Sequence, residues 1–172
     1  MKEHHLTADR ITHIRAYVHQ AAIDVLGPVS DPQTVHQAKF SMGFVLALIA
    51  LYQRAGIEEF SEEALHDPRI REVLGRVEMI FDLEIDAAYP QRWLGKVEVE
   101  TTDGDVFISH VAVPKGDSGN TLERVEIEDK ARRLAAYRQG AALSEIDRLI
   151  ALAWTLDRQA NVRDLLPRKE FA

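Results

Sequence analysis

Two side chains that can do chemistry, His36 and Lys39, stand at the start of the most apolar segment of the chain. The Lys39 ammonium, helped by the exposed N–H groups of a first helical turn, can bind an anion such as a carboxylate. His36 can donate or accept a proton near neutral pH. Ser41 follows at the expected helix start. The sequence therefore predicts a candidate site with His36 as the acid or base and with Lys39 and Ser41 as binding residues.

Each of these residues also has an ordinary structural interpretation. A lysine beside a buried helix can lie along apolar surface and keep its ammonium in water. His36 can be a loop histidine, and Ser41 is more typical of a helix cap than of a nucleophile, because no His/Asp partner set is readable near it. The residues alone favour these structural interpretations.

The segment that must position the site is residues 38–52, which is apolar on nearly every helical face. Such a helix is expected to be buried, with other elements packed on several sides. It is too short for a membrane span, which needs ~20 predominantly apolar residues. We expect it to end near residues 54–56, with Gly56 as the left-handed cap.

The composition excludes several classes of function. The chain has 172 residues, of which 46% are hydrophobic and 28% charged, as in an ordinary globular protein. A net charge of −7 argues against a nucleic-acid partner. With no cysteine, the chain offers no ligands for a Cys-zinc site or an iron–sulfur cluster, and no pair among its seven histidines has metal-ligand spacing. We expect no metal, no cofactor, no membrane partner and a cytoplasmic location.

The remaining patterns indicate an α+β fold. Alternation near residues 13–19, 78–81, 96–101 and 106–113 predicts strands, with a hairpin turn at Asp103 and Gly104. Ser61, Asp67, Thr121 and Ser144 are expected to begin helices. We expect a small, mostly antiparallel sheet covered by helices around a buried central helix. The predicted domains are an α+β domain at residues 1–118 and a C-terminal helical segment at residues 119–172.

An ordered series of short segments resembles the MmgE/PrpD family. The resemblance begins with Ala38, Lys39, Phe40 and Ser41, which look like the "AKFS" helix of that family, and it covers most of the chain from about residue 8 onward. The segments that carry it are, in order, residues 38–41, 56–61, 66–68, 102–104, 114–117, 128–131 and 150–152. The predicted 1–118 domain resembles the smaller domain of the family.

The resemblance implies a cofactor-independent lyase similar to 2-methylcitrate dehydratase or cis-aconitate decarboxylase. Such an enzyme acts on a small polycarboxylate by removing a proton next to a carboxylate, and the resemblance implies a role in propionate metabolism. Lys39 and Ser41 match the family's motif and are implied to line the site. Homodimers are usual in the family, so we expect a homodimer, or a separate chain that carries an N-terminal helical domain.

One departure from the family pattern leaves alternatives open. Family members are longer, and their N-terminal helical domain holds most acid/base residues, so this sequence resembles the C-terminal portion only. An alternative is a non-catalytic helper or dimerisation domain that keeps the fold. A small-ligand binding protein is a third possibility, supported only by the carboxylate-binding argument for Lys39.

Overall fold

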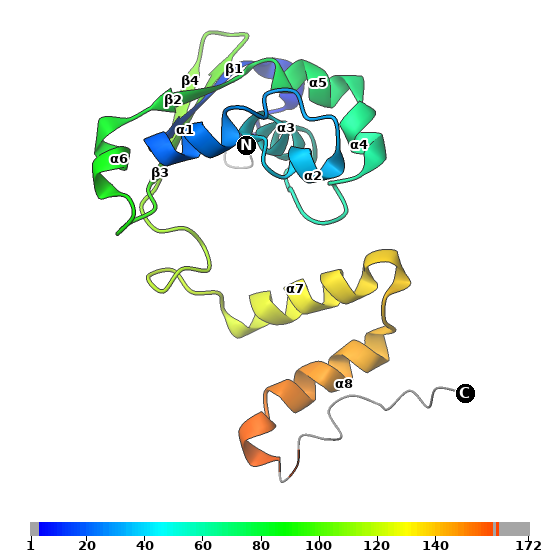
Figure 1. Ribbon diagram of the computed structural model, residues 1–172. Coiled ribbons are helices and arrows are strands. Elements are labelled where there is room, and N and C mark those ends of the chain that lie inside the picture. The colour runs from blue at the N-terminus through cyan, green and yellow to red at the C-terminus, as the bar shows by residue number, and fades with distance from the viewer. Residues whose placement is uncertain (1–3, 160, 162–172) are drawn as a thin grey trace. The chain divides into compact units, whose positions relative to one another are not determined.

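The computed structural model describes residues 4–159 and residue 161 (Figure 1). Contacts divide the chain into two units, Met1–Asn120 and Thr121–Ala172. The first unit carries the sheet and the central helix. The second carries the last two α-helices among the described residues. Residues 160 and 162–172 of the expected C-terminal segment lie outside the described residues.

A four-stranded mixed sheet organises the first unit, with strand order β2-β1-β3-β4 (Figure 1). The strands are β1 (Ile11–Val18), β2 (Val77–Phe81), β3 (Gly95–Thr101) and β4 (Val106–Val111). β3 pairs antiparallel with both β1 and β4, whereas β2 runs parallel to β1. A parallel pair needs a long crossover, and the helices between β1 and β2 provide it. The predicted α+β class is confirmed, although the sheet is not purely antiparallel.

Side-chain caps define most of the helices of the first unit. These elements are the 3-10 helix η1 (Ala8–Arg10) and the α-helices α1 (Gln20–Leu26), α2 (Val35–Ala38), α3 (Met42–Tyr52), α4 (Glu62–His66), α5 (Pro68–Leu74) and α6 (Leu83–Ala88). As predicted, Ser61 caps α4, and Asp67 caps α5 with Pro68 in its first turn. Each capping side chain accepts a hydrogen bond from an N–H group of the first helical turn, which has no partner within the helix.

The central helix α3 forms the core of the first unit. Phe44, Ala47 and Leu48 are fully buried and belong to one cluster with Ile70 of α5 and Ile14 of β1. A Cβ atom at residue 43 would lie 3.3 Å from the Leu74 side chain, so a glycine there lets α3 approach α5 closely. The predicted burial of this helix is confirmed for its inner face.

The ends of the central helix differ from the prediction. The apolar segment of residues 38–52 is split, because α2 ends at Ala38 and α3 starts after Ser41. The helix ends at Tyr52, and Gln53 adopts the left-handed conformation (φ 57°) in place of the predicted Gly56. Gly56 instead donates its N–H to the Glu59 carboxylate over 2.8 Å. Phe40 and Tyr52 remain 44% and 39% exposed, so the segment is not buried along its whole length.

The second unit contains a helical hairpin, α7 (Arg124–Ala136) and α8 (Leu143–Ala153), with short 3-10 turns at Tyr137–Gln139 and Leu156–Arg158. The expected starts are shifted, since α7 begins after Glu123 rather than Thr121 and α8 begins before Ser144. The Glu126 and Glu145 side chains accept from the N–H groups of Glu123 and Ala142 and so mark these starts. Within residues 4–159 and residue 161, no helix has the length and apolar character of a membrane span.

Replacing Leu48 with alanine tests the central place of α3. Leu48→Ala should lower the free energy of unfolding by about 2–5 kcal/mol, because it leaves a cavity in a fully buried cluster. Urea denaturation of both proteins, followed by circular dichroism, measures the loss. Leu83→Ala is the control, because Leu83 is 74% exposed. Equal small losses in the two variants would contradict the assignment of α3 as the core helix.

Candidate functional site

Lys39 lies on the surface between two buried residues. Ala38, before it, and Ser41, two residues after it, are each 1% exposed, whereas Lys39 and Phe40 are exposed. Backbone bonds hold this turn, from Lys39 N–H to the His36 carbonyl over 3.2 Å and from Phe40 N–H to the Gln37 carbonyl over 2.8 Å. The Lys39 ammonium has no hydrogen-bond or ion-pair partner within residues 4–159 and 161. The Lys39 backbone is therefore anchored next to buried residues, while its ammonium is exposed to solvent.

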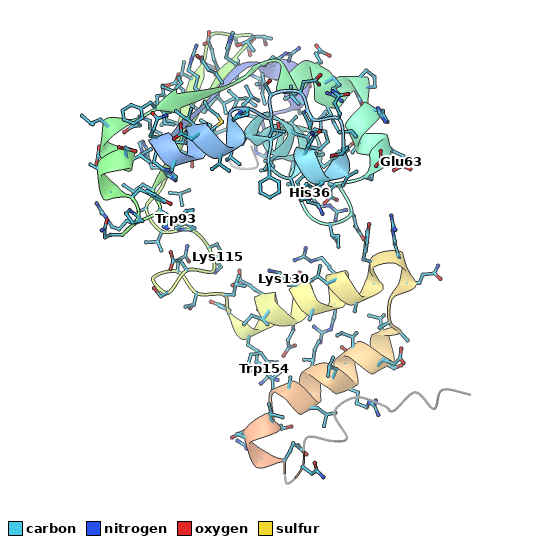
Figure 2. All side chains as sticks on the ribbon, viewed as in Figure 1. His36, Glu63, Trp93, Lys115, Lys130 and Trp154 are labelled. Atoms are coloured by element: carbon cyan, nitrogen blue, oxygen red, sulfur yellow. The ribbon has the colours of Figure 1, made fainter. Side chains whose placement is uncertain are left out.

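His36 stands on α2, three residues before Lys39. Its side chain is exposed, and Figure 2 shows it at the surface of the first unit. Its ring lies 5.3 Å from the Phe40 ring, centroid to centroid. Residues three apart on a helix are neighbours, so His36 and Lys39 share one surface. The role of His36 as an acid or base stays a prediction.

Ser41 is buried and caps the start of α3. Its hydroxyl accepts from Phe44 N–H over 3.3 Å, and its carbonyl accepts from Val45 N–H, so the residue caps α3. This is the structural interpretation that the sequence favours for it. Contact between Ser41 and a substrate stays a prediction.

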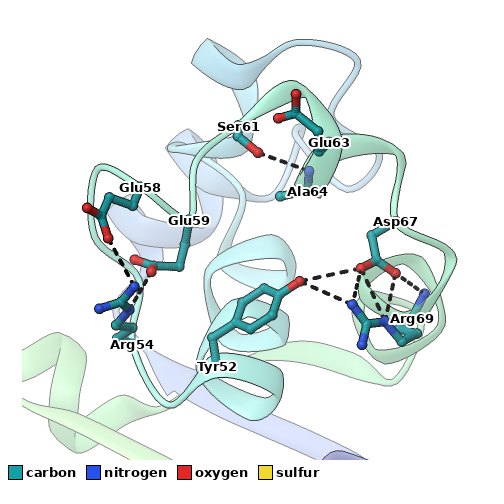
Figure 3. A pocket seen from close by; sticks show the side chains of 9 residues that line it. All are labelled: Tyr52, Arg54, Glu58, Glu59, Ser61, Glu63, Ala64, Asp67 and Arg69. Atoms are coloured by element: carbon teal, nitrogen blue, oxygen red, sulfur yellow. Dashed lines mark hydrogen bonds and ion pairs between the residues drawn. The ribbon is translucent and has the colours of Figure 1, made fainter. Parts of the chain in front are cut away.

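A separate hollow of about 790 Å³ opens beside Tyr52, and Figure 3 shows it from close by. We call it the Tyr52 hollow. Its lining residues are Tyr52, Arg54, Glu58, Glu59, Ser61, Glu63, Ala64, Asp67 and Arg69. Four of these side chains are carboxylates and only two are guanidinium groups. Such a lining repels a polycarboxylate.

Both cations of the Tyr52 hollow are already paired. Arg54 bonds Glu58 over 3.0 Å and also pairs with Glu59, while Arg69 lies 2.6 Å from Asp67. Figure 3 shows these two groups on either side of Tyr52, whose hydroxyl lies 3.4 Å from Asp67. The Arg69 side chain bonded to Asp67 is the main cause that lowers the pKa of that carboxyl to about 2. All of its lining residues fall within residues 52–69, but sequence patterns did not reveal the hollow, because they do not show how α3, α4 and α5 turn around it.

Neither region suggests a metal centre. Within the described ranges 4–159 and 161, no group of three or more His, Asp or Glu side chains is placed to hold a metal ion. The Lys39 surface presents an ammonium and an imidazole, the side chains of Lys39 and His36.

The pKa of Asp67 predicts a pH-dependent contribution to stability. A folded pKa of about 2 against an ordinary value of 3.8 means that the carboxylate stabilises the fold fully above about pH 4 and loses this contribution as the pH falls toward 2. Asp67→Asn, which keeps a capping side chain, should therefore unfold at lower urea concentration than the parent at pH 7, and most of this difference should be lost at pH 2. Asp9→Asn, at an exposed aspartate, is the control. A difference that persists unchanged at pH 2 would contradict the assignment.

Comparison with known proteins places the chain in a family. The sequence profile of the MmgE/PrpD C-terminal domain matches residues 1–156, which is most of the 172 residues. A search of curated proteins gives no significant match. The matched range contains the sheet, α3 and the α2–α3 turn with Lys39, so the family assignment covers the whole candidate site. The resemblance seen in the sequence is confirmed, and this chain belongs to the MmgE/PrpD family as its C-terminal domain.

Proposed function

We propose that this chain supplies one wall of the substrate site of a cofactor-independent lyase that resembles 2-methylcitrate dehydratase. The observation that carries the proposal is the exposed Lys39 ammonium, which has no partner within the described residues and lies between two buried residues. A cation without a partner can bind a carboxylate without first breaking an ion pair. The Tyr52 hollow is the weaker candidate, because its cations are already neutralised.

The proposed reaction removes a proton next to a carboxylate. Such a step needs a base for the proton and cations for the carboxylates, because negative charge builds up as the C–H bond breaks. Lys39 binds one carboxylate of a small polycarboxylate, and His36 is the candidate acid or base on the same surface. Both side chains are exposed, so further groups must close the site.

Those groups have two proposed sources. A homodimer brings a second copy, and a separate chain brings the N-terminal helical domain that the family resemblance implies. The same resemblance supports a cytoplasmic enzyme of propionate metabolism that works without a metal or an organic cofactor.

A non-catalytic helper or dimerisation domain is the alternative, and the second unit supplies the observation that favours it. The apolar side chains Ile146, Leu149, Ile150 and Ala153 of α8, and Trp154 directly after it, line a hollow of about 310 Å³ with Ile127, Glu128 and Ala131 of α7. Ile127 and Trp154 are 42% and 39% exposed. Exposed apolar stripes of this kind are typical of protein contacts. A helper should self-associate through this stripe and bind no polycarboxylate.

Binding and turnover assays test the proposed function together. The purified chain is titrated with 2-methylcitrate, citrate and cis-aconitate in a calorimeter, and alkene absorbance and carbon dioxide release are followed. We expect binding without turnover by the chain alone. Lys39→Ala should weaken binding about tenfold or more, because a charged hydrogen bond contributes about 1.5–3 kcal/mol.

Lys130→Ala is the matched control for that experiment, because it removes an exposed lysine from α7. Unchanged affinity in Lys39→Ala would exclude Lys39 as a ligand. Turnover by the chain alone that disappears in Lys39→Ala would show that no further domain is needed, and self-association without any binding would favour the helper.

A further inference from the structure

Arg71 of α5 bonds both the end of the neighbouring helix α4 and a loop that lies 39 and 40 residues away in the sequence. Its Nε donates to the Leu65 carbonyl at the end of α4 over 3.0 Å. Its Nη2 donates to the Pro32 carbonyl over 3.0 Å, and its Nη1 pairs with the Asp31 carboxylate. A guanidinium is suited to this arrangement, because its donors are held in one planar fork. Arg71 therefore fixes the loop that leads into α2.

A chain of hydrogen bonds continues from that loop into α2. Asp31 Oδ2 accepts from Gln33 Nε2 over 2.7 Å. Gln33 N–H in turn donates to Gln37 Oε1 over 2.8 Å. Gln37 lies within α2, between His36 and Ala38, and its carbonyl accepts from the N–H groups of Lys39 and Phe40. The contacts thus run without a break from Arg71 to the backbone of Lys39.

This chain of contacts matters because α2 has little support of its own. The helix has only four residues, and helices that short are not stable without tertiary contacts. Thr34 caps its start by accepting from Gln37 N–H over 3.2 Å, and Ala38 is its one buried residue. The Arg71 contacts therefore hold the N-terminal side of α2, while Ala38 and the Ser41 cap hold the C-terminal side.

We infer that Arg71 is a positioning residue for Lys39, acting through Asp31, Gln33 and Gln37. The inference rests on the proposed function, since it gives Arg71 a role in carboxylate binding without contact to the ligand. The Arg71 side chain bonds Asp31 and Pro32 in the loop before α2. Arg69 of the same helix instead bonds Asp67 and Tyr52. Arg69 therefore offers a matched control for any variant of Arg71.

Amide hydrogen exchange gives a readout that does not depend on any ligand. In Arg71→Met, the amides of residues 37–41 should exchange about tenfold faster, while those of β1 keep their rates. Arg71→Lys should be intermediate, because it keeps a charge opposite Asp31 but loses the fork that reaches two carbonyls. Arg69→Met should leave residues 37–41 unchanged. Unchanged exchange at residues 37–41 in Arg71→Met, or equal acceleration over the whole first unit, would overturn the inference.

A double-mutant cycle on citrate affinity then tests whether Arg71 acts through Lys39. Arg71→Met should weaken citrate binding several-fold in the parent chain and have no further effect in Lys39→Ala. An equal loss in both backgrounds would overturn the inference, because Arg71 would then act independently of Lys39. If Lys39→Ala itself leaves citrate affinity unchanged, the proposed function fails, and the exchange experiment still decides whether Arg71 holds α2.

Discussion

The candidate site depends on the burial of Ala38 and Ser41 on either side of an exposed lysine. Burial of the two flanking residues ties the α2–α3 turn to the core, and the Ser41 hydroxyl sets where α3 begins. Lys39 has no such constraint on its side chain, but its backbone cannot move without disturbing both neighbours. The buried cluster that contains Ala38 therefore anchors the backbone from which the Lys39 side chain extends.

Charge distinguishes the two candidate regions of the first unit. The Tyr52 hollow has a volume of about 790 Å³, yet its carboxylates outnumber its cations, and each cation is held in an ion pair. The Lys39 surface is open, and its ammonium has no partner in the described part of the chain. An unpaired cation attracts a polyanionic ligand more strongly than a cation that is already held in an ion pair. Because the Lys39 surface is exposed, other groups must enclose the ligand there. The size of a hollow alone would select the Tyr52 hollow, whereas an unpaired cation selects the Lys39 surface.

The fold class, the hairpin at Asp103 and the caps at Ser61 and Asp67 could be predicted from the sequence, because alternation and capping patterns are local. Helices α1 and α6 were not predicted. His19 caps α1 through its ring nitrogen, which accepts from Ala22 N–H, and histidine is an unusual cap. The parallel pairing of β1 and β2 depends on a crossover of more than 50 residues, which alternation does not reveal.

The same distinction between local and remote contacts applies to the site. Lys39, His36 and Ser41 could be selected from the sequence because they lie together at a helix start. Arg71 could not, because it reaches the α2 loop from 39 and 40 residues away in the sequence. Within the second unit, the predicted helical segment is confirmed for α7 and α8, and apolar side chains of both helices line one hollow.

The most direct test of this account is a map of citrate binding on the first unit by nuclear magnetic resonance. Backbone amide shifts are followed in the full chain as citrate is added. The account predicts that the largest shifts lie at residues 36–43 and that they are lost in Lys39→Ala. Shifts centred on the Tyr52 hollow, or shifts at residues 36–43 that persist in Lys39→Ala, would contradict it.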